Sequence, residues 1–211
     1  MGFIMRNNKT ALSRTAIIAA AGTIGLVLSG GTGAAAVDAT NTIVDQKGRA
    51  VEAISADTRI DWVPPLDGNP LTREWFHSGK ACFKVDVPAG ESWNGHITMG
   101  YQVGYPATLS GKISFQYQTP GLELEIGNDP KVDLFNLIPT LGIQLDVGFG
   151  PGIQSVDTAG GDVSGNEGCI TMSGFHGTVT GVLGTTTIRP FVRLVSGSGD
   201  VVVAYGPLSQ N

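Results

Sequence analysis

The residues with the clearest chemical potential are charged side chains in the segment 119–136. It carries four carboxylates and one amine: Glu123, Glu125, Asp129, Asp133 and Lys131. Glu123 and Glu125 could be an acid and base pair of a glycosidase, but both would lie at one hairpin tip without a surrounding cleft. In a single copy, the segment would be a solvated acidic loop. Repeated around a ring of subunits, its carboxylates would form rings at the mouth of a channel, and such rings select for cations.

The histidines and cysteines form no recognisable metal or redox motif. His77, His96 and His176 are not at metal-ligand spacing, and the two cysteines do not form a C-x-x-C pair. We therefore expect capping or packing roles for the histidines, no metal, no cofactor and no enzymatic activity. In an exported protein Cys82 and Cys169 could form a disulfide, or they could remain buried free thiols. The sequence leaves both alternatives open.

Two long stretches of alternating polarity, 109–118 and 137–149, flank the acidic segment. They contain 10 and 13 residues, compared with ~5–6 in an average soluble strand and ~9–11 in a tilted membrane-crossing strand. One apolar and one polar face is typical of an outer-membrane barrel, although the edge of a soluble sandwich is the simpler alternative. The polar positions predicted to line a pore are Lys112, Ser114, Gln116, Gln144 and Asp146.

A single lipid-facing hairpin could not exist alone in a membrane, because unpaired strand edges are not tolerated in hydrocarbon. The barrel would have to close between chains, each contributing two strands. A water-filled lumen needs ~16–18 strands, so the pattern predicts about eight chains in a ring.

The N-terminal residues 1–36 have the features of a secretory signal peptide. Arg6, Lys9 and Arg14 precede an apolar run of 13 residues at 16–28, and a small-residue cleavage motif ends at Ala36. The run is shorter than the ~17–25 residues of a membrane-spanning helix. Cleavage would leave 10 basic and 18 acidic residues, a net charge of −8. An acidic chain of this kind is not expected to bind nucleic acid.

The composition predicts an all-β fold. The chain has 31 glycines, only 15% charged residues and many Val, Ile and Thr. Outside the hairpin, short strands are expected at 81–87, 95–103, 152–158, 167–173, 176–182, 186–195 and 200–205, with a weak strand at 59–63. Asn69-Pro70 predicts the start of a two-turn helix over 71–77, closed by His77 and stopped by Gly79. Strands on both sides of a central insertion favour a β-sandwich.

Several motifs between residues 71 and 206 occur in a specific order. They are LTREWFHSG at 71–79, GYQVGYP at 100–106, GPGIQ at 150–154, DVSG at 162–165, HGTVTG at 176–181 and RPF at 189–191. In these motifs the chain resembles the MspA family of mycobacterial porins. The resemblance implies a goblet-shaped homo-octamer in the mycolic-acid outer membrane. Each subunit would add a β-sandwich to the rim and one hairpin to a sixteen-stranded barrel that conducts small hydrophilic solutes.

The resemblance also implies which residues form the constriction. The family has two adjacent aspartates, a glycine and a further aspartate there. In this chain the corresponding residues are Glu125, Ile126, Gly127 and Asn128, and Asp129 follows. One carboxylate is thus kept as Glu and two are replaced. With Glu123 nearby, we still expect a negative lumen that prefers cations.

The sequence predicts four segments and one function, that of an outer-membrane porin with a water-filled, cation-preferring channel for passive diffusion of small hydrophilic solutes and ions. The segments are the signal peptide at 1–36, the first part of the rim at 37–107, the barrel hairpin at 108–150 and the second part of the rim at 151–211. The expected partners are further copies of this chain, or a paralogous porin subunit, together with outer-membrane lipid, hydrophilic solutes and cations. The alternative is a secreted soluble β-sandwich that binds a ligand, for example a carbohydrate stacked on its tryptophans.

Overall fold

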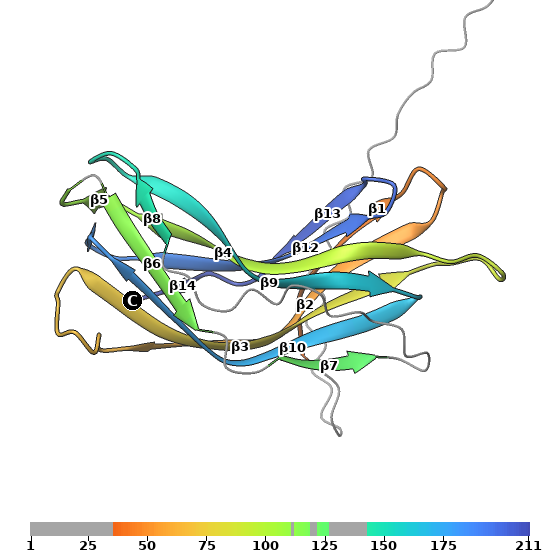
Figure 1. Cartoon of the computed structure of the whole chain (residues 1–211), viewed down its shortest axis with the longest axis horizontal. Helices are drawn as coiled ribbons and strands as arrows, with labels where there is room; N and C mark the ends of the chain where they lie inside the picture. Colours follow the sequence, from red (N-terminus) through yellow and green to blue (C-terminus); the bar gives the residue numbers. More distant parts are fainter. Residues whose placement is uncertain (1–35, 111, 119–121, 127–142) are drawn as a thin grey trace, which may run out of the picture. The chain divides into compact units, whose positions relative to one another are not determined.

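The computed structural model describes residues 36–110, 112–118, 122–126 and 143–211, with the backbone alone at 116–118, 122–126 and 143–145. The predicted signal peptide therefore lies almost entirely outside the described residues. Two larger sheets and one short sheet make up the described fold (Figure 1). The all-β prediction is confirmed. The described residues contain no helix long and apolar enough to cross a membrane.

The first sheet, here called sheet A, has the strand order β1-β2-β3-β10-β6-β8, and β7 also pairs with β10. Its strands are β1 (Val37–Val44), β2 (Ala50–Val63), β3 (Thr72–Val85), β6 (Lys112–Gln118), β7 (Leu122–Ile126), β8 (Ile143–Asp146) and β10 (Glu167–Thr180). Strand β10 is central. It pairs with β3 along one edge, while along its other edge 176–180 pair with β6 and 168–172 pair with β7.

The second sheet, sheet B, has the order β13-β12-β4-β9, with β14 also paired to β12. Its strands are β4 (Asn94–Tyr105), β9 (Gly152–Ser164), β12 (Thr187–Ser196), β13 (Val201–Tyr205) and β14 (Ser209–Gln210). A short pair, β5 (Ala107–Thr108) and β11 (Val182–Leu183), lies beside the base of the hairpin. Both sheets contribute to one hydrophobic core, in which Trp75 of β3 meets Tyr101 of β4 edge to face.

Four glycines within strands are explained by aromatic rings that lie over them from the neighbouring strand. Gly177 of β10 pairs with Trp75, and a Cβ at Gly177 would come within 2.5 Å of two atoms of the indole ring. The same arrangement joins three further register pairs: Gly168 with Phe83, Gly100 with Phe191 and Gly152 with Tyr105. Glycine in a strand therefore provides space for a large ring here, which compensates for its low strand propensity.

The predicted helix at 71–77 is wrong. Asn69 does form a turn, accepting hydrogen bonds from the backbone N–H groups of Leu71 and Thr72 at 2.9 and 3.0 Å, but strand β3 follows it directly. Strands β2 and β10 both pair with β3 over this segment. A two-turn helix has too few hydrogen bonds to compete with this pairing, and Trp and Phe favour strands.

Other element predictions are confirmed with changed boundaries. The strands predicted at 167–173 and 176–182 are one strand, β10, with an irregularity between Met172 and Phe175. The weak strand at 59–63 is the end of β2, whose earlier part was missed together with β1. Strand β1 is largely exposed and has no apolar alternation that would have revealed it.

Candidate functional site

The base of the predicted hairpin is present as an antiparallel pair of strands. Residues 112–115 of β6 pair with 143–146 of β8, and Lys112 lies directly opposite Asp146. Their side chains form an ion pair with 3.5 Å between Nζ and Oδ1 and remain 55% and 81% exposed. An exposed pair of this kind adds little stability, because water screens it. The ion pair is informative because of its position: it places two of the predicted pore-lining residues on one face that is exposed to water.

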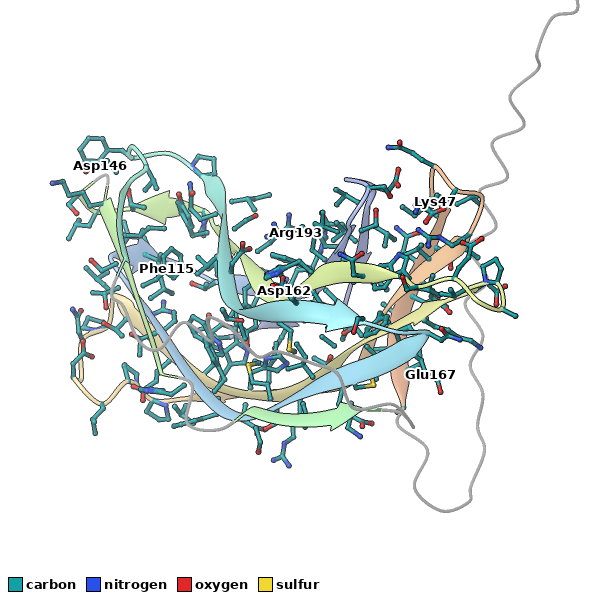
Figure 2. The ribbon with its side chains drawn as sticks, turned by 45° about the vertical axis from the view of Figure 1, so that its right-hand side comes forward. Lys47, Phe115, Asp146, Asp162, Glu167 and Arg193 are labelled. Atoms are coloured by element: carbon teal, nitrogen blue, oxygen red, sulfur yellow. A yellow bond between two sulfur atoms is a disulfide. The ribbon has the colours of Figure 1, made fainter. Side chains whose placement is uncertain are left out.

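The apolar side of β6 is buried in the protein core. Ile113 and Phe115 belong to the core shared by both sheets. Phe115 is labelled in Figure 2. At this level the apolar face of the first arm therefore packs against its own chain, not against lipid as its alternation suggested. The reason is that β6 pairs with β10, so its apolar side continues the core side of sheet A.

The other predicted pore-lining residues are placed by strand register. Ser114 pairs with Gln144 across the hairpin and with Thr180 of β10. Gln116 lies opposite Thr178 in the β6–β10 ladder. These pairings put all five predicted lining residues on the two strands of the hairpin base.

The predicted constriction is described only in part. Glu123 and Glu125 belong to β7, where they lie opposite Thr171 and Cys169 of β10. The segment 119–136 was expected to be a loop at the tip of the hairpin, so strand β7 within it is a difference from the prediction. Asn128 and Asp129 lie outside the described residues.

A disulfide joins Cys82 and Cys169, which resolves the alternatives left open by the sequence. The two residues are directly opposite each other on β3 and β10. The bridge therefore joins β3 and β10 near one end of the two strands, in the segment of β10 that also pairs with β7. Sequence spacing could not reveal it, because two cysteines with a sequence separation of 87 are brought together only by strand pairing.

The three histidines occupy three different environments. His77 is buried in the middle of β3, where its Nδ1 is hydrogen bonded to the Tyr101 hydroxyl. Burial lowers its pKa from 6.5 to about 4 and raises the pKa of Tyr101 well above its usual value. His96 is exposed, and its Nδ1 lies within hydrogen-bond distance, 2.7 Å, of the Asp162 carboxylate on β9. None of the three closes a helix.

His176 belongs to a cluster on sheet A that the sequence did not indicate. Its Nε2 lies 2.8 Å from the buried carboxylate of Glu74, and its ring stacks on Phe76 with 4.9 Å between ring centroids. The second carboxylate oxygen of Glu74 accepts a hydrogen bond from the backbone N–H of Leu66 at 2.7 Å. Glu74 thus connects β3, β10 and the loop before β3.

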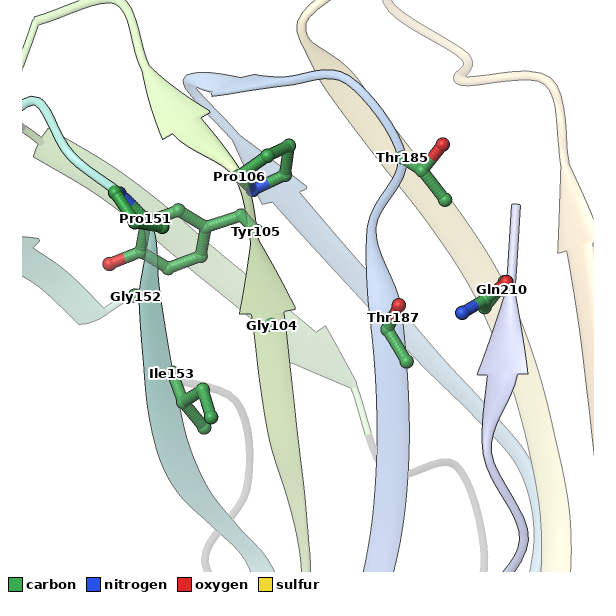
Figure 3. Close-up of a pocket in the computed structure, with 9 residues that line it drawn as sticks. All are labelled: Gly104, Tyr105, Pro106, Pro151, Gly152, Ile153, Thr185, Thr187 and Gln210. Atoms are coloured by element: carbon green, nitrogen blue, oxygen red, sulfur yellow. The ribbon is translucent and has the colours of Figure 1, made fainter.

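The described residues contain no group that resembles a catalytic or metal centre. No set of three or more His, Cys, Asp or Glu side chains in the described part of the chain could hold a metal ion. An open groove of about 740 Å³ lies beside the hairpin base between β4, β9, β12 and β14 (Figure 3). Its described lining includes Tyr105, Pro151, Ile153, Thr187 and Gln210, with no carboxylate, amine or imidazole.

Comparison with known proteins gives a consistent result. The MspA family model matches residues 47–209. Porin MspD of Mycolicibacterium smegmatis is 43% identical over 178 residues, which cover 81% of this chain and 86% of MspD. Porin MspA of the same organism is 42% identical over 203 residues, covering 93% of this chain and 96% of MspA. Porin MspB is 42% identical over 193 residues, 88% of this chain and 90% of its own length. These relatives are porins, not enzymes.

Proposed function

Because this chain belongs to the MspA family, we propose that it is an outer-membrane porin that forms a water-filled channel for small hydrophilic solutes and ions. Passive diffusion requires no cofactor and no catalytic residue. The family match over most of the chain carries this proposal. The exposed ion pair of Lys112 and Asp146 agrees with it, because it gives the hairpin base the wet side that a channel wall requires.

The channel would be assembled from several chains. One hairpin cannot close a barrel, and no strand edge can remain unpaired in hydrocarbon. We propose a goblet-shaped ring of about eight subunits, in which the hairpins at 108–150 form sixteen strands and the segments 37–107 and 151–211 form the rim. The ring could also include a paralogous porin subunit.

We propose that the channel prefers cations. Glu123, Glu125, Asn128 and Asp129 would lie at the constriction, where about eight copies of each carboxylate would surround one opening. Lys112, Ser114, Gln116, Gln144 and Asp146 would line the wall above them. After removal of a signal peptide at 1–36 the chain would carry a net charge of −8, and it would be exported to the mycolic-acid outer membrane.

The test is reconstitution of the purified mature chain into a planar bilayer. A porin requires detergent for extraction, runs as a large oligomer and produces discrete conductance steps. A secreted β-sandwich that binds a ligand remains soluble without detergent and produces no steps. A soluble monomer that leaves the bilayer silent would refute the porin proposal and support that alternative.

A further inference from the structure

The polar face of the hairpin continues into one face of the rim. Ser114 of β6 lies opposite Thr180 of β10, and Thr180 lies opposite Thr72 of β3. The Thr72 and Thr180 hydroxyls are hydrogen bonded at 3.0 Å, which confirms that these two side chains share a face. Residues directly opposite in an antiparallel ladder point to the same side of the sheet. The polar side of β6 and the outer side of sheet A are therefore one continuous surface.

This surface can be followed along β3 at every second residue. The residues of β3 on the outer side are Thr72, Glu74, Phe76, Ser78, Lys80, Cys82 and Lys84, whereas Trp75, Ala81 and Phe83 point into the core. The loop before β3 covers Glu74. Phe76 remains 41% exposed beside His176, and Lys84 is exposed opposite Glu167, at the end of β10 away from its pairing with β6.

The outer side of sheet B is separated from this surface by the core. On β12 the core residues are Ile188, Val192 and Leu194, so Arg189 and Arg193 lie on the opposite, outer side. Arg193 reaches Asp157 of β9 on that side at 2.6 Å. Arg189 lies over the ring of Tyr205, which is 47% exposed. If the polar side of β6 lines the lumen, only the outer face of sheet A continues that lining, because the outer face of sheet B lies on the other side of the core.

We infer that the outer face of sheet A lines the vestibule, the part of the channel enclosed by the rim. Phe76, His176 and Lys84 would then face the permeating solutes, whereas the outer face of sheet B would not. This inference rests on the proposed porin function. The stacked Phe76–His176 rings would form a repeated aromatic surface around the vestibule. Lys84 lies opposite Glu52 of β2 and Glu167 of β10, so it would offset part of the negative charge that these two carboxylates bring to the vestibule in each subunit.

The experiment compares matched substitutions on the two faces. Lys84→Glu and Arg189→Glu each reverse one exposed charge, on sheet A and on sheet B respectively. The readout is the zero-current potential of single channels across a gradient of KCl at low ionic strength, where the Debye length is ~30 Å at 0.01 M. Lys84→Glu should raise the permeability ratio of K⁺ over Cl⁻ roughly twofold, and Arg189→Glu should leave it unchanged.

A second pair of variants tests the same inference by adding a positive charge to each face. Phe76→Lys should lower the ratio of K⁺ over Cl⁻ permeability, whereas Tyr205→Lys should not alter it. The two rings are similarly exposed, so both variants should assemble. This pair decides the question if Lys84→Glu fails to assemble. A change confined to the sheet B variants, equal changes in both pairs, or no change in any assembled variant would overturn the inference. Absence of channels from the unmodified chain would instead refute the porin proposal.

Discussion

The interactions of the histidines and of the charged hairpin residues depend on how deeply each side chain is buried. His77 is enclosed in the core with Tyr101, whereas His96 and His176 each pair with a carboxylate near the surface. Lys112 and Asp146 remain in water although they neighbour buried Ile113 in the chain and in the ladder. Because polarity alternates between adjacent residues, one strand presents one side to water and packs its other side into the core.

Acid should destabilise the protein through His77. Its pKa is about 4 in the folded protein and 6.5 in the unfolded chain, so only the unfolded chain takes up this proton between these values. The stability that His77 contributes is fully present above pH 6.5 and is lost as the pH falls through 4, by about 3 kcal/mol. Thermal unfolding of the protein in detergent at fixed concentration would show a weaker decline of stability from pH 7 to pH 4 in His77→Gln. His96→Asn serves as the exposed control, and an unchanged pH dependence in His77→Gln would contradict this role.

Neutralising the proposed constriction should weaken cation preference. Glu125→Gln removes about eight carboxylates from one opening, so we expect the cation-over-anion permeability ratio to fall roughly twofold. Asp129→Asn should add to the effect, and the oligomer should remain intact. The zero-current potential across a salt gradient measures the ratio. Glu91→Gln removes the same charge from an exposed loop before β4 and should have no effect. An unchanged ratio in Glu125→Gln combined with Asp129→Asn would place the selectivity elsewhere.

At the scale of elements, long-range contacts join the strands of sheet A. Strand β10 connects β3, β6 and β7 through its two edges, and the disulfide crosses from it to β3. Large rings over glycines bring the same strands close together. The hairpin base is thereby attached to β10, which pairs with three other strands of sheet A.

Adding a methyl group at Gly177 should disturb this packing. A Cβ there would overlap the Trp75 indole ring, and overpacking of a core typically costs about 1–3 kcal/mol. We therefore expect Gly177→Ala to lower the thermal midpoint. Gly104→Ala is the matched control, because its Cβ would meet Thr187 only at ordinary distances of 3.8 and 4.0 Å. A lower midpoint in Gly104→Ala than in Gly177→Ala would refute the packing argument.

Loss of the disulfide should destabilise the rim. The bridge closes a loop with a sequence separation of 87, and loss of such a bridge typically costs about 2–5 kcal/mol. Chemical unfolding of the protein with Cys82 and Cys169 both replaced by Ser should therefore require less denaturant. A reducing agent should destabilise the unmodified protein and have no effect on the double variant. Equal stability with and without the bridge would contradict this expectation.

At the scale of the whole molecule, the described residues form two larger sheets and the base of a hairpin, and they close no barrel. The structure pairs β6 and β8 with each other, and such a pair needs neighbours on both sides before it can cross a membrane. The function proposed here therefore belongs to the assembly and not to the single chain. The same ring would multiply each charge on the vestibule wall by the number of subunits.

The assembly should contain about eight copies of the chain. Native mass spectrometry of the protein extracted in detergent measures this number directly. A peak near eight subunit masses is the expected result. A stable monomer under these conditions would refute the ring. A ring that contains a second, related subunit would retain the channel but contradict a ring of identical chains.

The sequence alone determined the properties that depend on local pattern. Glycine content and alternation indicated an all-β chain, and the order of motifs from 71 to 191 indicated the porin family. Only the tertiary structure decided which strands became neighbours. It placed His77 in a strand instead of at a helix end, joined Cys82 to Cys169 and buried Phe115 in the core. The physical reason is that a strand obtains its hydrogen bonds from partners distant in sequence, so its register and buried face follow from pairings that no local pattern encodes.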